Sequence, residues 1–160
     1  MQQINAATEQ GILTPRQLAA QVRRLIETPA DWVTRVRLDP EGRWYEQIPV
    51  AGLCELWLIS WLPGQSTGFH DHGGANGAFG VVWGQLDEHL PRRAGPLARQ
   101  VTAGRVRSFG QRHVHDVRNS SVDSVAVSVH AYSPPLSAMT RYELTACGLV
   151  PIRTEGADDW

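Results

Sequence analysis

Several features are scarce in this sequence, which contains no lysine, only two cysteines and no long apolar run. All 15 basic residues are arginines scattered along the chain, and the formal net charge is −1. Without a basic patch, neither nucleic acid nor an anionic membrane is an expected partner. Cys54 and Cys147 are too few for a disulfide framework, so both are expected to be reduced thiols.

Segments that would direct the chain to a membrane are also missing. The first residues, MQQINAATEQ, have neither the basic start nor the apolar centre of a signal peptide, and the most apolar stretch, LCELWLISWL, is short and interrupted by Glu55. We therefore expect a cytoplasmic protein. Nothing in the sequence specifies an oligomeric state.

Short apolar or alternating segments, separated by glycine- and proline-rich turns, fill the chain from Trp44 onward. The expected strands cover residues 44–50, 54–61, 69–71, 78–83, 85–90, 98–102, 106–109, 114–118 and 124–132. Many short strands with regular turns predict an all-β fold, a double-stranded antiparallel jelly roll. Before them, Thr14 and Pro15 start an amphipathic helix that ends at Pro29, and a second short helix is expected over residues 30–36.

The chain length and the absence of a linker predict one domain over residues 1–160. Within it, residues 1–40 form a helical cover, residues 44–135 a metal-binding barrel and residues 136–160 a C-terminal segment. The final residues, TEGADDW, are polar and are expected to be mobile.

Three histidines lie at a spacing that suits one metal ion. In GFHDHGG, His70 and His72 project to the same side of an extended strand while Asp71 turns away, because side chains alternate along a strand. In HVHDVRN, His115 supplies a third imidazole. Three neutral ligands would leave a ferrous ion its full charge and open coordination sites, which favours a soft, anionic thiolate as the substrate.

A second group of polar residues lies in SVAVSVHAYSPP, which reads as a strand with Ser128, His130 and Tyr132 on one face. In a hydrogen-bonded row, the serine would orient the imidazole and the imidazole would orient the phenol. The hydroxyl of Tyr132 could then position oxygen or transfer a proton at the metal. The alternative is that the three are only polar positions on a strand, but a buried polar row needs partners.

These motifs resemble known families. The glycine-framed spacings around the three histidines resemble the two signature segments of the cupin superfamily. Together, WLPGQSTGFHDHGG, HDVRN and AVSVHAYSPP resemble the cysteine dioxygenase family from about Trp44 to Pro135. The resemblance implies a cupin barrel with Fe(2+) as cofactor, and an enzyme that adds both atoms of O2 to the sulfur of a small thiol to give a sulfinate. It also suggests a cis bond between Ser133 and Pro134.

Three positions depart from the animal members of that family. Gly77 replaces a cysteine that is cross-linked there to the tyrosine matching Tyr132, so no thioether is expected; many other metal cupins have a glutamate ligand at this position. Met139 also replaces a cysteine and is expected only to line the pocket. Tyr45-Glu46-Gln47 replaces tyrosine, any residue, arginine, so Gln47 cannot form a charged fork to a substrate carboxylate.

Glutamine at this place resembles the branch of the family that prefers 3-mercaptopropionate over L-cysteine. A carboxylate in a partly dry pocket still needs a cation, and Arg141 is the expected one, although an arginine after the barrel could equally be a surface residue. Tyr45, Gln47 and Trp61 complete the expected substrate site.

The remaining histidines and tryptophans have less specific expectations. His113 is expected close behind the metal ligands or at the surface, and His89 at an exposed strand end. Among the tryptophans on strands, Trp57 and Trp83 are expected in the core, whereas Trp61 is expected to border the site.

Two other functions are open from the sequence. One is a different metal-dependent cupin, such as an isomerase or a carbon dioxygenase, although these usually need the glutamate that Gly77 replaces. The other is a cupin that binds a small molecule without catalysis, which would not need the row of Ser128, His130 and Tyr132. Metal content and oxygen consumption with a small thiol would separate the three.

Overall fold

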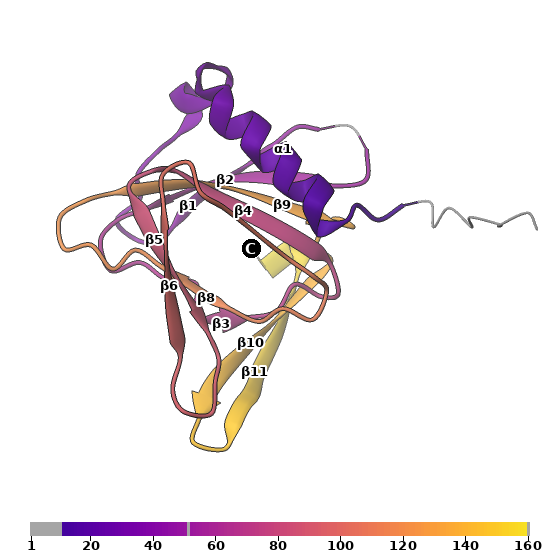
Figure 1. The fold of residues 1–160 in the computed structure, drawn as a ribbon, viewed down its shortest axis with the longest axis vertical. Helices are drawn as coiled ribbons and strands as arrows, with labels where there is room; N and C mark the ends of the chain where they lie inside the picture. Colours follow the sequence, from indigo (N-terminus) through magenta and orange to yellow (C-terminus); the bar gives the residue numbers. More distant parts are fainter. Residues whose placement is uncertain (1–10, 51, 160) are drawn as a thin grey trace, which may run out of the picture.

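The computed structural model describes residues 11–50 and 52–159 as one α-helix, three short 3₁₀ turns and a series of antiparallel strands (Figure 1). The helix is α1 (Pro15–Glu27), and the 3₁₀ turns are η1 (Pro29–Asp31), η2 (Val33–Arg35) and η3 (Ala157–Asp159). The strands are β1 (Trp44–Ile48), β2 (Glu55–Trp61), β3 (Phe69–His70), β4 (Asn76–Trp83), β5 (Gln85–Leu90), β6 (Leu97–Thr102), β7 (Val106–Phe109), β8 (Asp116–Arg118), β9 (Ala126–Ser133), β10 (Ala138–Thr145) and β11 (Gly148–Gly156).

The strands form three antiparallel sheets that surround the centre of the molecule. The largest has the order β1-β2-β9-β4-β7, and the two smaller ones have the orders β11-β10-β3 and β6-β5-β8. Figure 1 shows α1 across the outer face of the largest sheet, with the two smaller sheets on the opposite side of the barrel. The expectation of an all-β jelly roll behind an N-terminal helix is therefore confirmed.

Helix α1 begins where the sequence indicates. The Thr14 side chain accepts a hydrogen bond from the backbone of Gln17, whose own side chain accepts one from the Thr14 backbone, which is a complete capping box. Leu18 and Val22 are fully buried against the outer face of the large sheet. This apolar face fixes the helix to the barrel.

The expectation of a second helix over residues 30–36 is wrong. The segment instead makes the two turns η1 and η2. Trp32 lies between them, is only 2% exposed, and donates its indole N–H to the carbonyl of Leu25 at 2.9 Å. Burial of this one large side chain against the end of α1 sets the path of the segment and prevents a continuous helix.

Strand β9 shows how alternation separates the two cores. Val129 and Ala131 face α1 and belong to the outer core, whereas His130 and Tyr132 face the barrel interior and are 3% and 7% exposed. Because the interior positions of a strand repeat every second residue, the polar row predicted from the sequence lies inside the barrel.

Two strands of the C-terminal segment form one of the three sheets together with β3. Strands β10 and β11 form a hairpin, and β10 pairs with β3 so that Arg141 lies opposite His70 and Tyr142 opposite Phe69. Of the tail TEGADDW, the first three residues continue β11 and the next three form η3, whereas Trp160 lies outside the described residues. This hairpin therefore reaches the functional site directly.

Three smaller expectations can be assessed on the same structure. The Ser133–Pro134 bond is cis, as expected. Cys54 is buried and Cys147 exposed, and both are free thiols. Of the helices in residues 11–50 and 52–159, none has the length and apolar character needed to cross a membrane.

Candidate metal centre and substrate cavity

Backbone pairing places two of the three histidines side by side. The His70 N–H donates to the His115 carbonyl at 3.0 Å, and the His115 N–H donates to the His70 carbonyl at 3.2 Å. Such a reciprocal pair is the hydrogen-bonded position of an antiparallel ladder, where both side chains point to the same face. Residues far apart in the sequence are thereby fixed next to each other.

Hydrogen bonds of Asp71 and a close glycine turn position His72. Asp71 turns away from His70 and His72, as expected, and accepts hydrogen bonds from the Tyr142 hydroxyl at 2.8 Å and the Thr140 backbone N–H at 2.9 Å. Gly73 has a positive φ of +58°, and a Cβ there would lie 2.4 Å from the carbonyl oxygen of Ala138. The turn after His72 can therefore pass close to β10 only because this residue is glycine.

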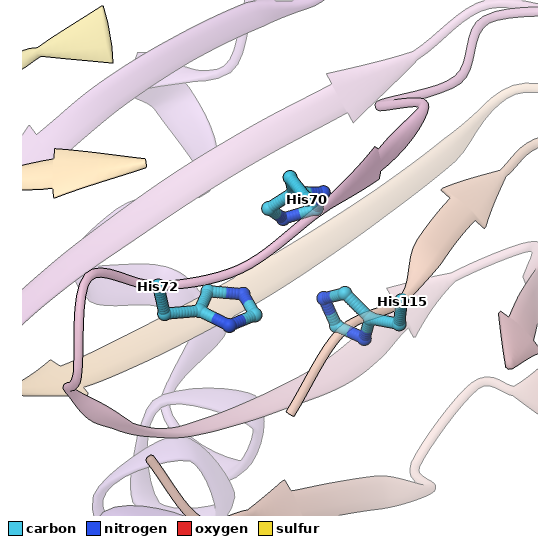
Figure 2. Close-up of side chains that lie close together, drawn as sticks. All are labelled: His70, His72 and His115. Carbon is cyan, nitrogen blue, oxygen red and sulfur yellow. The ribbon is translucent and has the colours of Figure 1, made fainter. Parts of the chain in front are cut away.

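The three imidazoles converge on one point (Figure 2). His70, His72 and His115 are buried, and their ligand atoms lie within 4.8 Å of one another. Their ring centroids are 4.8 to 5.0 Å apart. This is the donor set of a small metal centre with three nitrogen ligands.

The hydrogen bonds of these rings leave lone pairs for a metal. Nδ1 of His70 faces the Gly68 carbonyl at 3.0 Å, and Nδ1 of His115 faces the Glu88 carboxylate at 3.0 Å. Since both partners are acceptors, each Nδ1 carries the proton and each Nε2 keeps its lone pair. Neither ring nitrogen of His72 has a hydrogen-bond partner among the described residues, although both are buried. A metal ion fits this site because it would satisfy nitrogen atoms that are otherwise unpartnered.

The charge state of the rings also suits metal binding. Burial lowers the pKa of His70 and of His72 well below its usual value, and the neighbouring histidines lower it further. Burial lowers the pKa of His115 as well, although its hydrogen bond to Glu88 acts in the opposite direction. All three rings are therefore neutral near pH 7, which is the form that binds a metal.

Glu88 is a site residue that the sequence analysis missed. Its side chain is 1% exposed, and its carboxylate accepts hydrogen bonds from His115 and His113, each at 3.0 Å, and from Nε of Arg107 at 3.1 Å. Burial alone would raise the pKa of Glu88, but the hydrogen bonds from the two histidines outweigh it and keep the pKa below its ordinary value. An ionised carboxylate thus orients His115 from behind.

Glu88, His113 and His115 form a second group whose ligand atoms lie within 4.8 Å. In this group the polar atoms already satisfy one another, because both rings hydrogen-bond to the same carboxylate oxygen. We therefore interpret it as the support of the first centre and not as a second metal site. His113 lies close behind the metal ligands, which is one of the two positions expected for it. His89 was expected to be exposed but is half-buried.

An aromatic ring fills the space beside Gly77. A Cβ at Gly77 would lie 2.2 Å from the ring of Phe109, which packs against His72 and His113 with centroid distances of 4.7 and 4.4 Å. Gly77 lies opposite Tyr132 in the β4–β9 ladder. A side chain at this position would therefore require the Phe109 ring to move.

The row on β9 is hydrogen-bonded and extends one residue further than expected. Ser128 Oγ lies 2.8 Å from Nε2 of His130, and Nδ1 of His130 lies 3.2 Å from the Tyr132 hydroxyl. In addition, Nε1 of Trp61 donates to Ser128 Oγ at 2.8 Å. Because an indole nitrogen can only donate, the arrangement that satisfies every group has Ser128 donating to His130 and His130 donating to Tyr132. The Tyr132 proton is then directed away from the row.

Burial keeps this row uncharged. It lowers the pKa of His130 to about 3, with smaller contributions from His115 and Arg43. It also raises the pKa of Tyr132 above its ordinary value, and the charge of Glu55 adds to this effect. At neutral pH the Tyr132 hydroxyl is therefore a hydrogen-bond donor and not a phenolate.

Two of the metal-site histidines and two residues of the row, namely His70, His115, His130 and Tyr132, line one cavity of about 310 Å³. Its walls combine metal ligands, the row, apolar side chains and several charges, namely Arg43, Tyr45, Trp57, Ile59, Thr67, His70, His115, Val117, His130, Tyr132, Leu136, Met139, Arg141, Arg153, Glu155 and Asp159. Such a partly apolar cavity with a few convergent polar groups suits a small organic ligand.

The structure separates the expected substrate residues into two groups. Tyr45, Met139 and Arg141 line the cavity. Gln47 is not among the lining residues, and its side-chain amide instead donates to Glu55 at 3.4 Å. Trp61 is fully buried behind the row.

Trp57 takes the place that we expected for Trp61, because it is half-buried and lines the cavity. Trp83 was expected in the core but is 68% exposed.

Arg141 is not a surface residue, since its side chain is only 18% exposed. It is also not free, because it forms an ion pair with Glu155 at 2.8 Å. Arg43, which lines the same cavity, was not predicted from the sequence.

Comparison with solved structures shows the class of fold. The protein TT1209 from Thermus thermophilus is similar at 20% identity and a TM-score of 0.56, covering 64% of this chain and 94% of that protein. A protein with a double-stranded β-helix domain from Klebsiella pneumoniae is similar at 18% identity and a TM-score of 0.55. The match covers 64% of this chain and 85% of that protein. An RmlC-like cupin protein from Desulfovibrio desulfuricans is similar at 19% identity and a TM-score of 0.54. The match covers 63% of this chain and 91% of that protein. The chain thus has the cupin fold, and its buried histidines form a site compatible with metal binding.

The family is more specific than the fold. A family model described as cysteine dioxygenase type I matches residues 15–145. The chain therefore belongs to the cysteine dioxygenase type I family, and it is an oxidoreductase of this class.

Proposed function

We propose that the chain is a non-haem iron(II) thiol dioxygenase that acts on a small thiol carboxylate, either 3-mercaptopropionate or L-cysteine. In this reaction both atoms of O2 are added to the thiolate sulfur and a sulfinate is formed. The sulfur supplies the electrons, so no external reductant is required. The observation that carries the proposal is a cluster of three neutral imidazoles with Nε2 lone pairs at His70 and His115 and two unpartnered nitrogens at His72. Among residues 11–50 and 52–159, no carboxylate joins this group of ligands.

The donor set supports iron and a thiolate together. When bound, iron(II) would supply a redox-active cation at which a thiolate and O2 can meet. Because His70, His72 and His115 contribute no negative charge, the centre favours an anionic ligand more than a site with a carboxylate would. The carboxylate of Glu88 lies behind His115 and accepts its Nδ1 proton, so it holds the ring without occupying a ligand position.

The row gives this cavity a defined proton donor. Trp61, Ser128 and His130 hold the Tyr132 oxygen as an acceptor, which leaves the Tyr132 proton free to be donated into the cavity. Tyr132 can thus stabilise negative charge on a reacting oxygen or sulfur atom close to the histidines. The surrounding apolar walls, which include Val117 and Leu136, limit competing water.

Metal content and oxygen uptake test the proposal. Purified, iron-loaded protein should consume O2 with 3-mercaptopropionate or L-cysteine, and with 18O2 both labelled atoms should appear in the sulfinate. Changing Tyr132 to Phe should keep the iron but lower kcat by about 100-fold, whereas His115→Ala should lose the metal. Protein that binds zinc, retains it and consumes no oxygen with any thiol would contradict the proposal and favour another kind of metal cupin. The cytoplasmic location and the absence of nucleic-acid and membrane partners stay predictions.

A further inference from the structure

We propose that Arg43, rather than Gln47 or Arg141, anchors the carboxylate of the substrate. The inference rests on the proposed function and names the residue that selects for an anionic substrate. It follows from the positions and partners of the cavity arginines and not from the sequence motif around Tyr45, because Arg43 lies just before β1 and outside that motif.

The position of Arg43 suits a ligand of the metal centre. Its side chain lines the same cavity as His70, His115 and Tyr132. Its guanidinium carbon lies 5.3 Å from the centre of the Trp61 ring, a distance at which the ring face attracts the cation. Trp61 is itself fixed by its hydrogen bond to Ser128, so the guanidinium rests on a rigid surface next to the catalytic row.

The other arginines of the cavity are already occupied. Arg141 donates to Glu155 at 2.9 Å through Nε and to the Thr67 carbonyl at 3.0 Å, and it also forms an ion pair with Glu155 at 2.8 Å. Arg153 pairs with the second oxygen of Glu155 at 2.7 Å. One carboxylate of β11 thus neutralises two guanidinium groups, and neither has its full donor set available.

Arg43 has no comparable partner. Within residues 11–50 and 52–159, its guanidinium makes no hydrogen bond and no ion pair, and it contacts the Trp61 ring instead. Asp116, the acid whose charge favours it, is engaged by Arg118 at 2.5 Å and by Thr67 at 3.3 Å. Burial lowers the pKa of Arg43, and the charge of Arg141 lowers it further. The cavity therefore holds an uncompensated cation, which a bound anion would neutralise.

The chemistry of the anion follows from the geometry of the donors. A guanidinium presents paired N–H groups in one plane, and a carboxylate accepts two of them in parallel. A thiol carboxylate could place its sulfur toward the histidines and its carboxylate on Arg43. A thiol that carries only an amine would find no such partner there, since the Glu155 carboxylate is already neutralised.

Kinetics with matched thiols tests this assignment. For iron-loaded Arg43→Gln, KM for 3-mercaptopropionate and L-cysteine should rise about 10- to 100-fold, because a charge-assisted bidentate contact is lost. KM for cysteamine, which has no carboxylate, should change less than about 3-fold. Arg43→Lys should recover part of the loss, because it restores the charge without the fork. Arg93→Gln is the matched control, since it removes an exposed arginine between β5 and β6 that does not line the cavity, and it should change KM for every thiol by less than about 3-fold.

Anaerobic binding separates this inference from the proposed function. Propionate, which has the carboxylate but no thiol, should quench or enhance the tryptophan fluorescence of the iron-loaded protein, and this response should be lost in Arg43→Gln. Arg43-dependent propionate binding without oxidation of any thiol would retain the anchor and refute the dioxygenase. Equal rises of KM for acidic thiols and cysteamine, or equal effects of Arg43→Gln and Arg93→Gln, would overturn the assignment of Arg43.

Discussion

Replacing Glu88 with glutamine should weaken metal binding although Glu88 does not face the metal. The side chain is 1% exposed, and it accepts hydrogen bonds from His115, His113 and Arg107 at 3.0, 3.0 and 3.1 Å. Glutamine has nearly the same shape but only one accepting oxygen. If that oxygen faces His115, the amide N–H groups face the Arg107 donor, and one of the contacts becomes repulsive.

The loss of metal affinity in Glu88→Gln should match that of other partners behind a ligating histidine. Partners behind a ligating histidine typically contribute 10- to 100-fold to metal affinity, which corresponds to about 1.4 to 2.7 kcal/mol. The measurement is an anaerobic titration of the metal-free protein with cobalt(II) or iron(II), in competition with a chelator of known affinity. The dissociation constant of Glu88→Gln should rise by about this factor, while circular dichroism shows a folded barrel.

A second buried carboxylate provides the control. Asp116 follows His115 directly and is 0% exposed, but its partners are Arg118 and Thr67 and not an imidazole. Asp116→Asn should therefore change stability without a comparable change of metal affinity. An unchanged dissociation constant in Glu88→Gln, or an equal loss in Asp116→Asn, would refute the reasoning.

Two further changes address the row and the space beside it. Ser128→Ala removes the hydroxyl that joins Trp61 to His130, so kcat should fall about tenfold while KM for thiols stays nearly constant; an unchanged kcat would show that this hydroxyl does not direct the row. Gly77→Ala places a methyl group 2.2 Å from the Phe109 ring and should lower the free energy of unfolding by about 1 to 3 kcal/mol in urea denaturation. Gly110→Ala, where the nearest atom is 3.9 Å away, should show no such loss, and equal effects would contradict the packing argument.

Much of the barrel could be predicted from the sequence because its strands leave local patterns. Strand β9 alternates apolar and polar residues, whereas β2 and β4 are short, largely apolar runs. The same alternation predicts that His70 and His72 share a face and that Ser128, His130 and Tyr132 form a row. These are local consequences of the backbone.

The hairpin of β10 and β11 could not be recognised in the same way. Nearly all of β10 is partly exposed, so neither face carries a distinct apolar pattern. In β11, Pro151 interrupts the pattern, and it lies at the irregularity of the ladder next to Tyr142. Strands that are neither buried nor fully exposed leave a weak signal in a single sequence.

The missed site residues depend on contacts between distant segments. Glu88 lies between Asp87 and His89, a polar run that resembles an exposed strand end, and only its alternation with the fully buried Leu86 indicates an inward position. The state of Arg141 depends on Glu155, which reaches it through the pairing of β10 with β11. The spacing of Arg141 and Glu155 in the sequence does not show that their side chains form an ion pair.

The reciprocal backbone bonds between His70 and His115 have a consequence for biosynthesis. His70 is flanked by His115 on one side and by Arg141 of β10 on the other. A nascent chain therefore lacks the complete site until β10 and β11 have left the ribosome. Since the ligand geometry forms only on closure of the barrel, a metal ion would bind the folded chain in preference to its unfolded precursors and would stabilise it selectively.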